Sequence, residues 1–474
     1  MISGANTTPR NSKTRPCDAF RVVAKPAGAL CNLECDYCYF LKKADLYPGS
    51  SFRMSDEVME KYIRQTIEGQ RGPAVTIAWQ GGEPTLMGLE FFRRAMAVQQ
   101  KYLRPGMAVE NALQTNGVLL DEDWCAFLRE NNFLVSLGLD GPRELHDAYR
   151  HDKAGGSVFD QVVGAARMMR KQGVAFNVLC AVNAVNSRRP LEVYRFFRDE
   201  LGTRHIQFIP LVERDNDSGY QEGTRLTDRS VQPEQYGRFL VEVFDEWLRR
   251  DVGEMVVQPF DGVLASRLRG YSTLCIFRPS CGDSAALEHN GDLYSCDYFV
   301  EPGYYLGNIR EKPVAELVGS AKQQAFGRAK SETLPRYCRE CEYFFACFGE
   351  CPKNRVLTTP DGEPGLNWLC PGLKTFFRHT ERPIKIMADL LRRGRTPSQV
   401  MAAVEAEGKD KAVGVGHDDP CPYGIKSFIT SFVKTPGKVK PGGLPFVAQR
   451  GVNLKRPCGA ADRKGERPDA FRSR

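Results

Sequence analysis

Three cysteines near the N-terminus are spaced as Cys31-x3-Cys35-x2-Cys38. Thiolates in this pattern can bind three irons of a four-iron cluster, and the fourth iron is then left without a protein ligand. A small molecule can bind and react at such an open iron. Zinc is the structural alternative, but zinc takes four ligands, and no nearby histidine or fourth cysteine completes the trio. The spacing therefore predicts an iron-sulfur reaction site.

Eight further cysteines stand in the C-terminal half. They are arranged as Cys275-x5-Cys281-x9-Gly291-x4-Cys296, then Cys338-x2-Cys341-x5-Cys347-x3-Cys351, then Cys370 after a gap of 18 residues. Eight thiolates are the number needed to hold every iron of two more four-iron clusters. Two structural zinc sites are the alternative, because four-cysteine zinc sites share the C-x2-C element. Of the other five cysteines, Cys125 and Cys180 lie in apolar surroundings and are expected in the core, whereas Cys17, Cys421 and Cys458 match no motif.

The elements that must position these cysteines follow from the apolar pattern. Short apolar runs alternate with amphipathic stretches between residues 20 and 250, which predicts an α/β fold with six βα units and a parallel sheet, as in a partial TIM-type barrel. Ser55 is a predicted helix N-cap. The expected strands cover residues 20–24, 74–79, 133–139, 174–182 and 205–212, with another that ends in Gln114-Thr115-Asn116-Gly117.

The polar and glycine-rich turns all follow predicted strands. Gly81-Gly82-Glu83-Pro84 comes after the second strand, Asp140-Gly141-Pro142 after the fourth, and the cysteine trio after the first. In parallel α/β sheets the active groups lie at the C-terminal ends of the strands. We therefore expect the cluster and these turns to share one rim. The periodicity fades and the cysteine density rises beyond residue 250, so the predicted domains are 20–255 and 256–380.

Composition narrows the class of protein. The chain has 474 residues, 42% of them hydrophobic, and its N-terminus lacks an apolar signal region. Metal ligation in a reducing compartment fits the C-x2-C pairs better than disulfides, so we predict a cytoplasmic protein without a membrane span. The net charge of +8 comes from residues 381–474, which hold 19 basic and 10 acidic residues. We expect residues 1–19 to be flexible and 381–474 to be a basic, disordered Gly/Pro-rich extension, with no nucleic-acid partner.

The cysteine trio, with Tyr37 before its third member, resembles the signature of the radical S-adenosylmethionine (SAM) superfamily. The resemblance implies that the open iron chelates SAM and yields a 5′-deoxyadenosyl radical. Gly81-Gly82-Glu83-Pro84 looks like the family motif whose backbone holds the SAM amino group. The later cysteines resemble the SPASM domain. That resemblance implies one auxiliary cluster on Cys275, Cys281, Cys296 and Cys351, and a second on Cys338, Cys341, Cys347 and Cys370.

Five longer segments are similar to anaerobic sulfatase-maturating enzymes. They are Lys25-Pro-Ala-Gly-Ala-Leu-Cys-Asn-Leu-Glu-Cys35, Trp79-Gln-Gly-Gly-Glu-Pro-Thr-Leu86, Leu113-Gln-Thr-Asn-Gly117, Leu139-Asp-Gly-Pro142 and Gln207-Phe-Ile209. The resemblance covers about residues 20 to 380. It implies oxidation of a cysteine or serine to Cα-formylglycine in an unfolded sulfatase polypeptide with a Cys/Ser-x-Pro-x-Arg motif. It further implies three four-iron clusters, SAM, and an electron donor of the flavodoxin or ferredoxin type.

Individual roles are implied by the same resemblance. Asp297, directly after Cys296, matches the aspartate that takes the proton from the substrate, and an auxiliary cluster would accept the electron. The expected SAM contacts are Tyr37, Gly82, Gly138, Arg150 and Val212, and the expected substrate contacts are Gln80 and Phe40. Two positions depart from the family pattern. Gly138 stands where close relatives have serine, with Ser136 on the same strand face, and Phe40 stands where relatives can carry tyrosine.

Two other functions remain open at this stage. A SPASM enzyme that forms a thioether or other crosslink in another peptide would need the same eleven cysteines, although no leader-binding segment is visible ahead of residue 20. A non-catalytic iron-sulfur or zinc scaffold would use the clusters only for structure. A substrate assay separates the first alternative from sulfatase maturation, and SAM cleavage separates the second.

Overall fold

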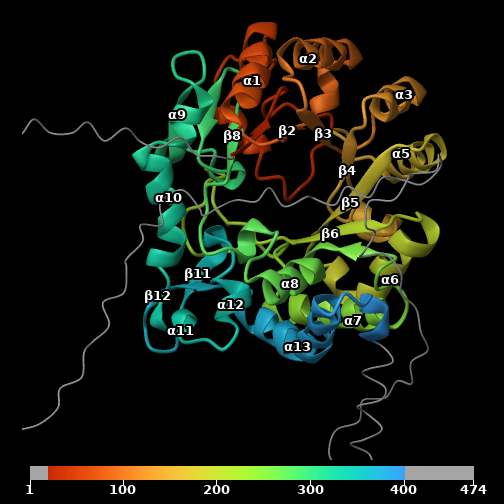
Figure 1. Ribbon diagram of the computed structural model, residues 1–474, viewed down its shortest axis with the longest axis vertical. Coiled ribbons are helices and arrows are strands. Elements are labelled where there is room, and N and C mark those ends of the chain that lie inside the picture. Colours follow the sequence, from red (N-terminus) through yellow and green to blue (C-terminus); the bar gives the residue numbers. More distant parts are fainter. Residues whose placement is uncertain (1–19, 401–474) are drawn as a thin grey trace, which may run out of the picture.

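The computed structural model describes residues 20–400, which form one continuous ten-stranded sheet with helices around it (Figure 1). Strands β1 to β7 lie side by side in chain order and are parallel. Their bounds are Arg21–Ala24, Ala74–Trp79, Ala108–Thr115, Leu134–Gly138, Ala175–Val182, His205–Pro210 and Val256–Val257. The six predicted parallel strands are therefore confirmed, with ends that differ by no more than two residues where both ends were predicted.

Helices connect successive strands and cover the outer face of the sheet, as Figure 1 shows for α1, α2, α3 and α5. The buried faces of the strands contribute Val75, Ile77 and Trp79 on β2 to the core beneath these helices. The helices are α1 Asp56–Gly69, α2 Leu89–Tyr102, α3 Glu122–Glu130, α4 Arg143–Asp147, α5 Phe159–Gln172, α6 Pro190–Arg195 and α7 Pro233–Arg250. None of the helices within residues 20–400 is long and apolar enough to cross a membrane.

Helix α1 illustrates how the sequence forms these elements. The Ser55 hydroxyl accepts a hydrogen bond from the Val58 N–H at 3.3 Å, so the predicted N-cap is confirmed. The apolar residues at helical spacing are all buried: Val58, Met59, Tyr62, Ile63 and Ile67. Tyr62 also donates its hydroxyl to the Val22 carbonyl at 3.1 Å, which ties α1 to the first strand. The helix thus fixes the strand that precedes the cysteine trio.

The sheet does not stop at the predicted domain boundary near residue 255. Strand β8, Ser284–Leu287, pairs in parallel with β1, so residues of the cysteine-rich half extend the same sheet on its other side. The strands β9 Asp292–Tyr294 and β10 Tyr305–Asn308 continue it in antiparallel fashion. The remaining elements are α8 Gln258–Arg269, α9 Val314–Val318, α10 Ala321–Glu332, α11 Arg336–Arg339, α12 Phe344–Cys347, the hairpin β11 Arg355–Thr358 with β12 Pro364–Asn367, and α13 Cys370–Arg392.

The basic extension begins later than its predicted start at residue 381. Helix α13 runs unbroken from Cys370 to Arg392 and packs against α7 and α8. Ile384, Met387 and Leu390 repeat at helical spacing and are buried, and this apolar stripe outweighs Pro383 inside the helix. The segment 381–392 therefore belongs to the folded core. The predictions for residues 1–19 and 401–474 lie outside the described residues.

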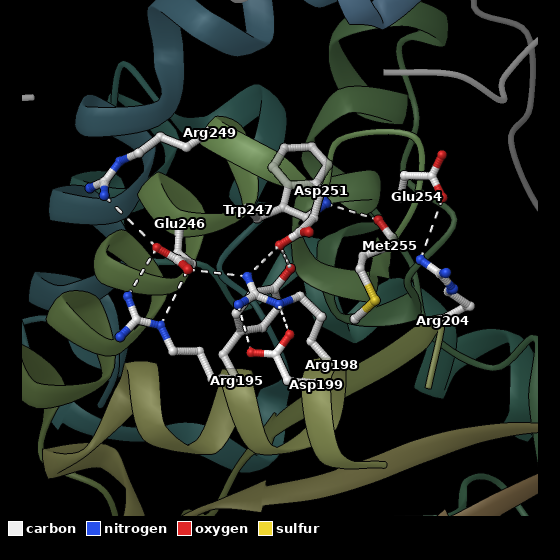
Figure 2. A network of polar contacts seen from close by, with 11 residues as sticks. Arg195, Arg198, Asp199, Arg204, Glu246, Trp247, Arg249, Asp251, Glu254 and Met255 are labelled. Atoms are coloured by element: carbon white, nitrogen blue, oxygen red, sulfur yellow. Dashed lines mark hydrogen bonds and ion pairs between the residues drawn. The ribbon is translucent and has the colours of Figure 1, made fainter. Parts of the chain in front are cut away.

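A network of arginines and carboxylates joins α7 to the preceding crossover (Figure 2). Glu246, 1% exposed, lies between Arg195 at 3.2 Å and Arg198 at 3.1 Å, and Arg198 also contacts Asp251 at 3.0 Å. A buried carboxylate is costly unless it is paired. These contacts fix the α6 end to α7 at the edge of the sheet that leads into the cysteine-rich half.

Candidate active site

The cysteine trio lies on a loop between β1 and the 3-10 helix η1, Leu41–Leu46. The backbone of the glycine turn after β2 pairs with this loop: the Gly82 N–H donates to the Gly28 carbonyl at 2.8 Å, and the Glu83 N–H donates to the Leu30 carbonyl at 2.9 Å. A Cβ at position 82 would lie 2.0 Å from the Leu30 oxygen. In this structure the need for glycine at position 82 therefore comes from the cysteine loop itself.

Glu83 of the same turn has a structural role. Its carboxylate is buried and accepts hydrogen bonds from the Thr115 hydroxyl at 2.8 Å and from the Asn116 N–H at 2.7 Å, both at the end of β3. Burial raises the pKa of Glu83 above its usual value, against the effect of these donors. The Asn116 amide in turn lies 3.8 Å from the Cys31 sulfur. The turn thus links the ends of β2 and β3 to the loop that carries Cys31, Cys35 and Cys38, which we call the cluster loop.

The three thiols are partly buried and share one loop. Burial raises the pKa of Cys31 to about 11 and that of Cys35 to about 12, and it also raises that of Cys38. Iron binding must therefore release their protons. Among residues 20–400, no three His, Cys, Asp or Glu side chains converge tightly enough for a single metal ion. In a four-iron cluster each thiolate would bind a different iron.

A charged group lies directly beside the cluster loop. Arg150, which is partly buried, donates to Asp140 at 2.8 Å, and the Tyr37 hydroxyl donates to the same carboxylate. Burial opposes the charged form of Asp140, but Arg150 outweighs it and holds the pKa of Asp140 below its usual value. The Asp-Gly-Pro turn thereby holds Arg150 against Tyr37, with the guanidinium 5.5 Å from the ring centroid. Two of the predicted SAM contacts, Tyr37 and Arg150, are thus brought together.

The place of the Arg150 side chain explains why this chain has glycine at position 138, where close relatives have serine. A Cβ there would stand 2.9 Å from one guanidinium nitrogen of Arg150 and 3.3 Å from the other. Arg150 therefore occupies the space above the end of β4 that a serine side chain would use. The contact of Gly138 with SAM stays a prediction, and position 138 has only backbone atoms with which to make it.

Asp297 lies where the two halves of the chain meet. Its carboxylate contacts the Lys25 ammonium through one oxygen, and the other accepts a hydrogen bond from the Tyr39 hydroxyl at 2.9 Å. Burial, together with the Asp297 charge, raises the pKa of the Tyr39 phenol, so the hydroxyl remains a donor. Phe40 is only 4% exposed and lies 4.3 Å below the Lys25 nitrogen. This geometry does not favour the predicted substrate contact of Phe40.

The eight later cysteines separate into two groups in space. Cys338, Cys341, Cys347 and Cys370 line one cavity beside Tyr337 and Lys374. In the other group, burial is the main cause of the raised pKa of Cys351, and Glu350, Cys281 and Cys275 add to it. Cys351 and Cys275 act in the same way on Cys296. The crossed cluster assignment that the SPASM resemblance implies stays a prediction. Cys125 and Cys180 are fully buried in the core, as predicted.

The remaining predicted contacts are Gln80 and Val212, which follow the C-terminal ends of β2 and β6. The Gln80 amide donates to the Gln114 side chain on the neighbouring strand, while the Gln80 side-chain oxygen is buried and has no partner. The Val212 side chain is 4% exposed, and its carbonyl accepts from the Lys353 ammonium at 3.2 Å. Lys353 is buried between this carbonyl and Tyr298, next to Asp297 in sequence. Val212 is therefore coupled to the cysteine-rich half.

No sequence motif indicated a role for Lys25, Tyr39 or Lys353. None identified Asp140 as the partner of Arg150. Lys25 stands at the start of a quoted motif, and Tyr39 directly follows Cys38. Their type and place were visible, but their partner Asp297 is more than 250 residues away. Because Tyr39 and Phe40 are adjacent and both aromatic, the sequence did not show which of the two side chains faces the site.

Comparison with known proteins defines the class first. Residues 27–197 match the model of the radical SAM superfamily, and residues 275–342 match that of the SPASM iron-sulfur cluster-binding domain. The first match spans the cysteine trio and strands β2 to β5. The second contains Cys275, Cys281, Cys296, Cys338 and Cys341. The chain is therefore a radical SAM protein with an iron-sulfur cluster-binding domain.

Individual relatives narrow the family. The chain is 43% identical over 396 residues to the serine-type anaerobic sulfatase-maturating enzyme of Bacteroides thetaiotaomicron, covering 81% of this chain and 95% of that one. It is 35% identical to the cysteine-type enzyme of Clostridium perfringens, covering 76% and 95%. The solved structure of native anSMEcpe with bound AdoMet and Cp18Cys peptide superimposes with a TM-score of 0.69 at 33% identity, covering 78% and 99%. The chain belongs to the anaerobic sulfatase-maturating enzymes, which are radical SAM oxidoreductases.

Proposed function

We propose that this enzyme oxidises a cysteine or serine of an unfolded sulfatase polypeptide to Cα-formylglycine, with Asp297 as the base. The observation that carries the proposal is the place of Asp297. It directly follows Cys296, and it contacts Lys25 at the end of β1 and Tyr39 beside Cys38. A proton acceptor at the junction of both cysteine-rich regions is suited to a reaction that removes a hydrogen atom, a proton and an electron from one side chain.

The proposed clusters use the cysteines already described: Cys31, Cys35 and Cys38 for the reactive cluster, and the two groups of four for the auxiliary ones. When bound, the reactive cluster and SAM supply the radical that takes the β-hydrogen of the substrate. Tyr37, Arg150 and the turn around Gly82 would hold SAM, and Gln80 would contact the peptide. Asp297 accepts the thiol or hydroxyl proton, and Cys296, directly before it, would hold an auxiliary cluster that could supply an acceptor for the remaining electron. A serine then becomes the aldehyde directly, whereas a cysteine becomes a thioaldehyde that water converts to the aldehyde with release of hydrogen sulfide.

The partners in this proposal are a sulfatase segment with a Cys/Ser-x-Pro-x-Arg motif and a low-potential donor of the flavodoxin or ferredoxin type. Support for a peptide partner comes from the relative solved with a bound peptide. A cytoplasmic location is part of the same proposal, because unpaired thiols in this number persist in a reducing compartment.

The test uses the anaerobically reconstituted full chain with SAM, a reductant and paired peptides that differ only in Cys or Ser at the target position. We expect a mass loss of about 18 Da for cysteine or about 2 Da for serine in at least one peptide. Iron analysis should give about twelve irons per chain. SAM cleavage with no mass change in either peptide would contradict sulfatase maturation.

Asp297→Asn tests the proposed base. We expect the variant to cleave SAM at a rate close to that of the parent enzyme but to form at least about a hundredfold less formylglycine, because general base catalysis contributes that much or more. The measurement is the ratio of formylglycine to 5′-deoxyadenosine by mass spectrometry and chromatography. An unchanged ratio would remove Asp297 from this role.

A further inference from the structure

The carboxylate of Asp297 is held at both oxygens by residues from outside its own segment. Lys25 contacts Oδ1, and the Tyr39 hydroxyl donates to Oδ2 at 2.9 Å. The Asp297 side chain is nevertheless 24% exposed, whereas that of Lys25 is 2% exposed. The carboxylate is therefore fixed in direction while part of it stays open to the site.

Lys25 is rigidly placed for this contact. The backbone N–H of Lys25 donates to the Leu287 carbonyl at 2.8 Å, where β1 and β8 end. Gly81 has a φ of +122°, and a Cβ there would lie 3.0 Å from the Lys25 Cβ, so the lysine stem runs directly along the glycine turn. The ammonium lies 4.3 Å from the centroid of the Phe40 ring. A lysine buried this deeply needs an anionic partner, and a ring face adds to its stabilisation.

Tyr39 supplies a phenol next to the position where the family can carry one. The side chain of Phe40 is turned into the protein beneath Lys25, whereas Tyr39 reaches Asp297 and packs against Tyr298 with ring centroids 5.3 Å apart. Phe40 packs against the Lys25 ammonium, whereas Tyr39 donates a hydrogen bond to the Asp297 carboxylate.

We propose that Lys25 and Tyr39 are the positioning residues of Asp297. The inference rests on the proposed function of Asp297. Lys25 directs one oxygen and supplies the counter-charge, and Tyr39 fixes the rotation of the carboxylate. A base that turns away from the substrate leaves the substrate radical without its proton acceptor, although SAM is still cleaved. Loss of either residue therefore uncouples SAM cleavage from product formation.

The test compares Lys25→Met and Tyr39→Phe with two matched controls. Lys43→Met removes another lysine of 1% exposure, whose ammonium binds the Gly219 carbonyl at 2.9 Å. Tyr47→Phe removes another phenol, which bonds to Tyr294 at 2.8 Å. We expect formylglycine per 5′-deoxyadenosine to fall at least about tenfold in Lys25→Met and about threefold to tenfold in Tyr39→Phe. Both controls should keep the parent ratio.

A second pair of measurements separates positioning from general damage. Peptide binding by fluorescence anisotropy and cluster content by iron analysis and electron paramagnetic resonance should stay at the parent level, so that kcat changes and KM does not. If Lys25→Met fails to assemble clusters, Tyr39→Phe decides, since it removes only one hydroxyl.

The outcomes are distinct from those for the proposed function. If the parent enzyme converts neither peptide, the proposed function fails. If the parent converts a peptide and Tyr39→Phe keeps the parent ratio with intact clusters, the positioning role is overturned. Equal uncoupling in Lys43→Met would also overturn it, because any buried lysine would then have the same effect.

Discussion

At the scale of single residues, two glycines and one histidine act through the space and the charge around them. Gly82 has an ordinary backbone conformation and is excluded from other types only because the Leu30 carbonyl occupies the place of a side chain. Gly138 leaves room for the Arg150 guanidinium. His146 is fully buried, and its ring accepts the Asp140 N–H at 3.4 Å. Each of these residues thus leaves space for, or bonds to, a group that lies beside the proposed SAM site.

Gly82→Ala should be severely destabilising. The new Cβ would stand 2.0 Å from a backbone oxygen of the cluster loop, and backbone cannot yield as a side-chain end can. We expect a loss of at least about 3 kcal/mol and little iron at the first cluster. Gly164→Ala is the control, because that exposed glycine in α5 has open space around it; alanine there should stabilise the helix by about 0.5–1 kcal/mol. Equal melting temperatures for both variants would contradict this account of position 82.

His146 should make the enzyme sensitive to mild acid. Burial, with Arg150 nearby, lowers the pKa of His146 to about 3 in the folded chain, against about 6.5 when unfolded. Between these values the unfolded state binds more protons, so stability falls as the pH falls from 6.5. At pH 5.5 the loss relative to pH 7.5 is about 1.4 kcal/mol.

The melting temperature of His146→Gln should therefore fall less between pH 7.5 and 5.5 than that of the parent enzyme. His379→Gln is the control, because the hydrogen bond that the His379 ring donates to the Asp245 carboxylate raises the pKa of His379. Removing His379 should leave the loss due to His146 in place. An identical pH slope in His146→Gln and the parent would refute the assignment.

At the scale of elements, helix α13 links the proposed second auxiliary cluster to the barrel. It begins at Cys370 and crosses α7 where Gly372 meets Gly237. A Cβ at Gly372 would lie 1.9 Å from the Pro233 carbonyl, and one at Gly237 would lie 2.6 Å from the Gly372 Cα. The helices can approach this closely only because both crossing residues lack side chains. The position of Cys370 thus depends on the contact between two helices.

Gly372→Ala should displace the start of α13 and with it Cys370. We expect a lower melting temperature, with a loss of about 1–3 kcal/mol in stability, and a loss of iron that approaches one of the three proposed clusters. Electron paramagnetic resonance of the reduced protein should still show the SAM-responsive cluster, since Cys31, Cys35 and Cys38 lie on another element. Full iron content with unchanged stability would show that the crossing tolerates a methyl group.

At the scale of the whole molecule, the two cysteine-rich regions share one sheet. β8 completes the exposed side of β1, and α8 and α13 cover α7 through Phe244, Phe260 and Phe376. A chain that ends at residue 255 would leave the edge of β1 unpaired and this aromatic cluster open to water. Unpaired strand edges and apolar faces promote aggregation.

We therefore expect residues 1–255 alone to be insoluble or to lack a cooperative thermal transition, although they contain the whole cysteine trio and all six predicted strands. Circular dichroism and sedimentation of this fragment beside the full chain measure the difference. A soluble fragment that melts cooperatively and binds iron would show that the barrel folds independently of the cysteine-rich half.

Local patterns determined much of this protein. The alternation of apolar runs predicted the parallel strands, the Ser55 cap predicted the start of α1, and cysteine spacing predicted a trio and a separate set of eight thiols. These features depend on residues close in the chain, where periodicity and spacing carry the information. The buried stripe of 384–390 was also present in the sequence, but Pro383 and the basic composition obscured it.

Only the tertiary structure decided which distant groups meet. Asp297 contacts Lys25 and Tyr39 across more than 250 residues, and the backbone oxygen of Leu30 sets the identity of Gly82. Such contacts arise from the order in which β8, β1 and β2 pair, and no local pattern records that order. The cysteine trio therefore indicated the class of chemistry in the sequence, whereas the pairing of β8 with β1 in one sheet brought Asp297 beside Lys25 and Tyr39.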